Sequence, residues 1–161
     1  MDPKQAHIRL VLIAGILALA FFVFFSEAQE SAPQEEVAEV ETIIALKVGT
    51  STFSTLIADT PDKQRQGLSG RPSLEQDQGM LFLFDRSLVR SFWMKEMNFP
   101  IDIIWIDENK RITGYKQNAL PESFPETFGS EVPVQYVFEV NAFETSRRGI
   151  ELGDVVEFVY E

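Results

Sequence analysis

Few side chains in this 161-residue chain could do chemistry. There is no cysteine, which excludes disulfides, thiolate nucleophiles and zinc fingers. The only histidine, His7, lies beside a hydrophobic segment, so Ser-His-Asp and Cys-His sites lack their base and histidine-ligated metal sites are excluded. Catalysis would therefore depend on carboxylates, Lys, Arg, Tyr, Ser or Thr, or on a hard cation bound through oxygen.

Among the carboxylates, Asp102 stands out because it lies between Ile101 and Ile103 in an apolar run. A carboxylate buried there is costly unless it is paired. Arg71 is the preferred partner, since a guanidinium can hold a carboxylate with two parallel hydrogen bonds, and Lys95 is the alternate. Such a pair would be either a structural clamp or part of a polar site.

A second group of candidates lies at the end of a predicted strand, where Phe92, Trp93 and Met94 precede Lys95. Strand alternation sends Phe92 and Trp93 to opposite faces, so something besides the main core must cover at least one ring. The segment is either a wall that orients a ligand or a core strand ending in a hairpin. The predicted ligand-binding residues are Arg71, Met80, Trp93, Met94, Lys95 and Asp102.

Three functions fit these candidates. A binding module with a shallow site around Asp102 and Trp93 is the preferred hypothesis. The first alternative is a hydrolase acting on an envelope or extracellular glycan or peptide, with Asp102 and a second acid from Glu96, Glu139 or Asp154; two carboxylates about 5 to 10 Å apart in one cleft would favour it. The second alternative is a structural envelope protein, which the absence of a pocket near Trp93 would favour.

Composition narrows the partners. The net charge is -11 and the pI is about 4.6, which would repel phosphate backbones, so we predict no nucleic-acid partner. Acidic clusters at 107–109 and around Asp154 do not repeat the alternating ligands of a calcium loop, so no metal and no cofactor are predicted. A small ligand or an envelope protein remains the expected partner.

The N-terminus carries an insertion signal. Residues 10–25 are all apolar or Gly, with Lys4, His7 and Arg9 before them. A helix over residues 8–25 would be about 27 Å long, close to a bilayer core of roughly 30 Å. The cationic flank predicts a single-pass protein of the cell membrane with a cytoplasmic N-terminus and an extracytoplasmic domain. Cleavage near Ala28 is the alternative and would give a secreted or periplasmic protein.

The rest of the chain divides into a tether and a domain. Residues 1–26 are the signal-anchor or signal peptide, and residues 27–41 are a flexible acidic linker rich in Glu, Gln, Ala and Ser. Residues 42–161 show short apolar runs separated by turn signals, which is typical of all-β folds. The predicted strands are 42–48, 52–58, 79–84, 89–94, 101–106, 111–117, 134–140 and 155–160.

The fold class is therefore mainly β: a single compact β-sandwich-like or barrel-like domain with one or two short helices, preceded by an N-terminal hydrophobic helix. One helix is predicted at 60–66, with Thr60 as cap and Gly67 at the exit. Another is predicted at 142–148, where Asn141 and Glu144 are spaced like a capping box and Gly149 ends the helix.

Two connections are also predicted. Residues 107–110 are a hairpin turn between strong strands. Residues 121–133 contain three prolines and cannot continue a ladder. This loop is either a lid or binding edge, or a crossover connection with Phe124 and Phe128 in the core.

An ordered series of motifs runs through the chain beyond residue 42. It comprises Gly67-Leu68-Ser69-Gly70-Arg71, Gly79-Met80-Leu81-Phe82-Leu83-Phe84, the stretch 92–107, Pro121, Tyr136-Val137-Phe138-Glu139-Val140, Gly149-Ile150 and Gly153-Asp154. In this series the chain resembles the domain of unknown function 192 family. The resemblance implies a compact β-sandwich-like or barrel-like fold, often behind a signal or anchor, and it implies no known activity.

The chain departs from the family pattern in two places. Glu96 and Met97 stand where the family usually has Asn-Thr, so a polar pair has become an acid and a thioether. Phe143 stands where the family tends to have glycine, which puts in doubt any pocket that needs a bare backbone at that point.

Overall fold

The computed structural model describes residues 41–160. The predicted hydrophobic helix within residues 1–26 and the linker up to residue 40 lie outside the described residues. Within residues 41–160, no helix is both long and apolar enough to cross a membrane.

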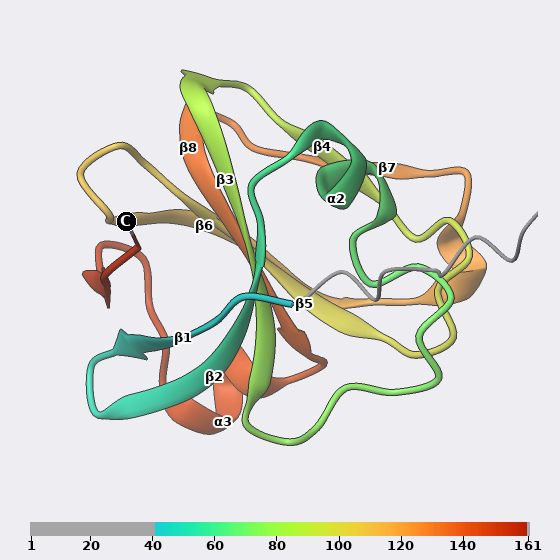
Figure 1. Cartoon of the computed structure of the whole chain (residues 1–161), viewed down its shortest axis with the longest axis horizontal. Coiled ribbons are helices and arrows are strands. Elements are labelled where there is room, and N and C mark those ends of the chain that lie inside the picture. The colour runs from blue at the N-terminus through green and yellow to red at the C-terminus, as the bar shows by residue number, and fades with distance from the viewer. Residues whose placement is uncertain (1–40, 161) are drawn as a thin grey trace, which may run out of the picture. The chain divides into compact units, whose positions relative to one another are not determined.

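Strands are the main regular elements of the described residues, as the sequence predicted (Figure 1). Short helical segments lie between them: α2 (Pro61–Gln66), the 3-10 turn η1 (Pro121–Ser123) and α3 (Glu144–Arg148). The strands are β1 (Ile43–Val48), β2 (Ser51–Ala58), β3 (Gln78–Leu88), β4 (Ser91–Trp93), β5 (Ile101–Ile106), β6 (Ile112–Ala119), β7 (Thr127–Gly129), β8 (Val134–Asn141) and β9 (Val156–Phe158).

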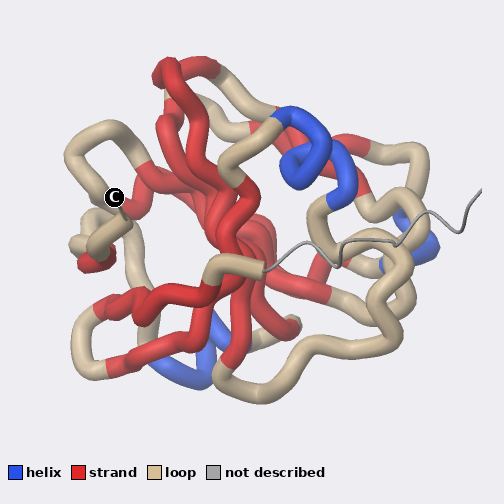
Figure 2. The backbone as a smooth tube through the Cα atoms, in the orientation of Figure 1, coloured by secondary structure: helices blue, strands red, loops and turns tan. Residues whose placement is uncertain are grey.

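Seven of these strands form one curled sheet in the order β6-β5-β8-β3-β2-β1-β9. The β2–β3 pair is parallel and the other neighbouring pairs are antiparallel. Hydrogen bonds from the Ile112 amide to the Asp154 carbonyl (3.0 Å) and from the Gly153 amide to the Ile112 carbonyl (2.8 Å) draw the two ends of the sheet together. The sheet is therefore a half-barrel (Figure 2).

The curled sheet has an apolar cluster on each face. The inner face carries Phe53, Leu81, Ile104, Ile106 and Phe138, which come from strands all around the curl. The outer face carries Leu68, Phe82, Ile103, Trp105 and Val137. A two-stranded ribbon of β4 and β7 lies over this outer face, as does α2 (Figure 1). All six residues of β5 are buried because both faces of the sheet are covered.

The predicted strands are all present, with shifted ends. The loop prediction for 121–133 was wrong in one respect, because residues 127–129 form β7 and pair with β4. Phe128 packs against the outer cluster, as the crossover interpretation required. Phe124 remains 43% exposed and contacts Trp93 edge to face.

The first helix forms as predicted, because the Thr60 hydroxyl accepts a hydrogen bond from the Lys63 amide and Gly67 ends the helix. The second helix, α3, is shorter than predicted, and the predicted capping box does not form. The Asn141 side chain instead donates to the carbonyls of Leu74 and Glu75. Helix α3 begins after Phe143, whose φ of 66° lies in the left-handed region.

Candidate functional site

Three acidic side chains are buried in the described part of the chain: Asp102, Glu139 and Glu144. A buried carboxylate needs hydrogen bonds, a cationic partner or a proton. The three meet this requirement in different ways, and the difference identifies the candidate site.

Asp102 is fully buried on β5 and accepts four hydrogen bonds. Its Oδ1 accepts from the amides of Asn118 and Phe143, each at 2.9 Å. Its Oδ2 accepts from the amide of Thr145 at 3.0 Å and from the Thr145 hydroxyl at 2.6 Å. The carboxylate thus joins β5, the end of β6 and the start of α3, which is a structural role.

The predicted partnership between Asp102 and Arg71 is wrong. Arg71 pairs with Glu41 instead, and its carbonyl accepts from the Asn98 side chain at 2.9 Å. The reason lies in the faces of the sheet. Asp102 shares the inner face with Ile104, whereas Arg71 follows Leu68 in a loop that packs on the outer face.

Glu144, in the first turn of α3, is fully buried and pairs with two guanidinium groups. Arg147 and Arg148 lie three and four residues further along the chain, so their side chains reach back to the same carboxylate. Arg148 also pairs with Asp77. The negative charge of Glu144 is therefore balanced by two arginines of its own helix.

Glu139 has no such partners. It is 5% exposed, and within residues 41–160 no hydrogen bond or ion pair reaches its carboxyl group. Its neighbours across the sheet are Met80 on β3 and Ile103 on β5. Burial raises the pKa of Glu139 from 4.5 to about 8. At neutral pH the group is therefore a neutral acid, able to donate one hydrogen bond and to accept others.

Glu139 lines a pocket of about 380 Å³ on the outer face. Several aromatic rings line it: Phe82 and Phe92 meet edge to face with centroids 5.0 Å apart, and Trp93 is 52% exposed at the rim. Polar groups from α2 and the following loop, including Gln64 and Ser69, complete the lining. Glu139 is the only acid among the described residues that line this pocket.

Arg90 is the second unusual group in this pocket. Its guanidinium lies 3.9 Å from the centroid of the Phe84 ring, and one terminal nitrogen donates to the Arg86 carbonyl at 2.8 Å. Its Nε is buried and has no hydrogen-bond partner within the described residues. Desolvation by this burial lowers the pKa of Arg90. The pocket thus contains a neutral acid, and its lining includes a guanidinium whose Nε is buried in the protein without a partner.

The structure separates the residues predicted from sequence. Trp93 lines the Glu139 pocket, whereas Met80 and Met94 are buried in the outer cluster. Lys95 is exposed and pairs with Glu96 at 3.6 Å. Whether any of the six predicted residues binds a ligand stays a prediction.

Sequence reasoning treated Glu139 only as a possible second acid and missed Arg90. A signal for Glu139 was present, because it shares one face of β8 with Val137, an apolar residue that marks this face as covered.

The hydrolase hypothesis required two carboxylates in one cleft. On paired strands Asp102 lies opposite Val140 and Ile103 lies opposite Glu139, so Asp102 and Glu139 point to opposite faces of the sheet. Residues 41–160 also contain no group of three or more acidic or histidine side chains that could hold a metal ion. The chemistry that this geometry favours is recognition by a neutral acid in an aromatic pocket.

Comparison with known proteins gives a family and a fold. The family model DUF192, described as Uncharacterized ACR, COG1430, matches residues 44–158. No curated protein matches the chain. Two crystal structures are similar at 30% identity. One is a candidate transcription regulator from Sinorhizobium meliloti 1021, with a TM-score of 0.70, covering 73% of this chain and 95% of that one. The other is a protein of unknown function from Novosphingobium aromaticivorans DSM 12444, with a TM-score of 0.71, covering 81% and 95%.

Proposed function

The chain belongs to the DUF192 family, and we propose that it is a binding module whose ligand places an uncharged amide-type group against Glu139. The observation that carries this proposal is a buried carboxyl group with no partner in the described residues, at the wall of an aromatic pocket. The carboxyl group is largely removed from solvent and opens only on the pocket, so a ligand that supplies hydrogen bonds would offset part of its desolvation.

The chemistry of the pocket defines the ligand class. A neutral carboxyl group presents an O–H donor beside a carbonyl acceptor, and an amide presents the complementary acceptor and donor. The rest of the ligand would be apolar or aromatic, because Phe82, Phe92 and Trp93 form the walls. A cationic amine is a poorer match, since it would require Glu139 to ionise in an apolar site.

The location is a further part of the proposal. The apolar run of residues 8–25 and its cationic flank support a membrane-tethered domain outside the cytoplasm. A net charge of -11 supports a role that does not involve nucleic acid.

A probe series tests the ligand class on the full chain. We expect 2-naphthamide to bind at pH 6.5, and to bind at least about tenfold more weakly at pH 9.5, where Glu139 is ionised. Binding is measured by ligand-detected NMR, with 2-naphthylmethylamine as the cationic control. Glu139→Gln should keep binding at both pH values, because it retains a donor and an acceptor and does not titrate.

Glu139→Leu fills the same space without polar atoms and should abolish binding. Equal binding of the amide to Glu139→Leu and to the wild type would overturn the proposal. Preferential binding of the amine would overturn it as well.

A further inference from the structure

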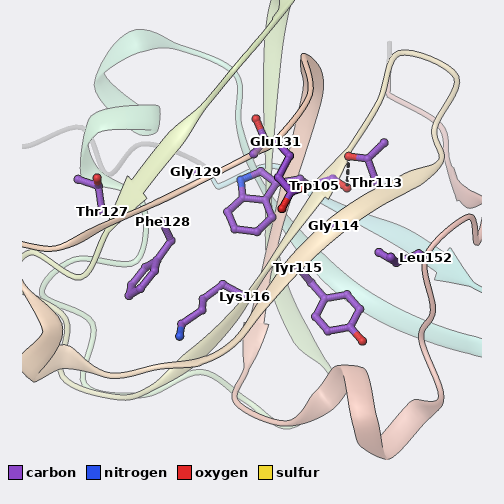
Figure 3. Close-up of a pocket in the computed structure, with 11 residues that line it drawn as sticks. Trp105, Thr113, Gly114, Tyr115, Lys116, Thr127, Phe128, Gly129, Glu131 and Leu152 are labelled. Carbon is purple, nitrogen blue, oxygen red and sulfur yellow. Dashed lines mark hydrogen bonds between the residues drawn. The ribbon is translucent and has the colours of Figure 1, made fainter.

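A second pocket, of about 500 Å³, lies beside the outermost strand of the sheet (Figure 3). Trp105 comes from β5, Lys116 from β6 and Phe128 from β7. The Glu139 pocket is lined by α2 and β4, and the two pockets share no lining residue. The second pocket is therefore separate from the site described above.

The indole of Trp105 provides an aromatic wall. Trp105 lies opposite Gly114 in the β5–β6 register. A Cβ built on Gly114 would be 3.5 Å from Cε3 of the indole, so any side chain there would extend over the ring. Glycine at this position leaves space beside the indole on β6, the strand at the end of the sheet.

Two polar groups in this pocket lack acceptors within residues 41–160. Trp105 is 6% exposed, and its Nε1–H is buried without a hydrogen-bond partner. Among the described residues, no carboxylate lies within ion-pairing distance of the Lys116 ammonium, which lies 4.8 Å from the centroid of the Phe128 ring. Figure 3 shows the Lys116 side chain extending toward Phe128 beside the indole.

Both groups are hydrogen-bond donors, but only the Lys116 ammonium is open to a ligand, because the indole nitrogen is buried in the protein. A matching ligand must therefore bring acceptors and negative charge. The acidic surface of the chain would repel a polyanion but would tolerate one small anion at an unpaired lysine. Glu131 is the only acid that lines the pocket among the described residues, and it is exposed.

We infer that this second pocket binds a small aromatic carboxylate. The planar body packs beside the Trp105 indole in the space left by Gly114, and the carboxylate pairs with Lys116. Binding is reversible and involves no covalent step.

NMR titration of the full chain with 2-naphthoate tests this inference. The chain has two tryptophans, so Trp93→Phe leaves the indole N–H signal of Trp105 alone. We expect saturable shifts of that signal, and at least about tenfold weaker binding for Lys116→Gln, the loss expected for one charge-assisted hydrogen bond. The matched control is Lys110→Gln, because Lys110 also lies over a phenylalanine ring, 4.1 Å from the Phe158 centroid, outside this pocket.

The remaining variants separate the alternatives. Glu131→Gln should leave binding unchanged or tighten it, because it removes a repulsive charge; weaker binding would indicate a zwitterionic ligand and overturn the inference. Equal affinity for 2-naphthamide, or unchanged binding in Lys116→Gln, would overturn it too. Glu139→Leu should bind 2-naphthoate normally, so the failure of one site does not decide the other.

Discussion

Asp102 and Glu139 are buried carboxyl groups on adjacent strands of the same sheet, and their surroundings are opposite. Asp102 faces inward and accepts four hydrogen bonds from β6 and the start of α3. Glu139 faces outward and receives none from the described residues. Burial alone therefore does not distinguish a structural acid from a candidate site. The number of satisfied oxygens does.

The two faces of the sheet differ in the same way: buried polar contacts stabilise the inner face, and the pockets lie on the outer face. On the inner face, Asp102 accepts hydrogen bonds from Phe143 and Thr145 and so holds the start of α3 against the sheet. The outer face is covered by α2 and the β4–β7 ribbon, and pockets lie along that cover. A segment that covers a sheet packs less completely than a strand that pairs within it, so ligand sites form more readily there.

The largest effect is expected from Asp102→Ala. Truncation leaves four donors without an acceptor, so we expect the free energy of unfolding to fall by about 3–5 kcal/mol. Denaturant unfolding measures this change. The control is Asp107→Ala, which removes an acceptor of two amides in an exposed turn and should cost about 1 kcal/mol. A loss of under 1 kcal/mol for Asp102→Ala would contradict the structural role.

Glu139 should give the next largest effect, through pH. Its pKa is raised on folding, so below about pH 4.5 the carboxyl group is neutral in both states and costs no stability. As pH rises toward 8 the unfolded state ionises first, and stability should fall by up to about 1.4 kcal/mol per pH unit. Glu139→Gln should remove this slope and be at least as stable as the wild type at pH 7. Unfolding curves at several pH values check this, and a wild-type slope retained in Glu139→Gln would contradict it.

Strand positions were predictable because hydrophobic runs and turn residues are local signals. The β5 run and the Thr60 cap follow directly from the chain. The partner of Asp102 was not predictable, because its donors come from residues 118, 143 and 145, and only the pairing of β5 with β6 and β8 brings them together.

The capping box failed for a similar reason. Asn141 has the spacing for a cap, but the loop before β3 passes close enough to take both hydrogens of its side-chain amide. The backbone at Phe143 is left-handed, a conformation that glycine adopts without strain, so glycine at this position is a physically reasonable expectation.

Arg71→Ala should have the smallest effect and sharpens the contrast with Asp102. If Arg71 neutralised a buried Asp102, its removal would cost several kcal/mol. In the structure Arg71 pairs with Glu41, whose side chain is 53% exposed, and a pair of this kind contributes about 0–1 kcal/mol. Denaturant unfolding of Arg71→Ala, Glu41→Ala and the double variant should therefore give losses under about 1 kcal/mol, with little coupling. A loss near that of Asp102→Ala would instead place Arg71 in the Asp102 network. Asp102 would then be a carboxylate stabilised by arginine, as Glu144 is, and not one stabilised by backbone amides.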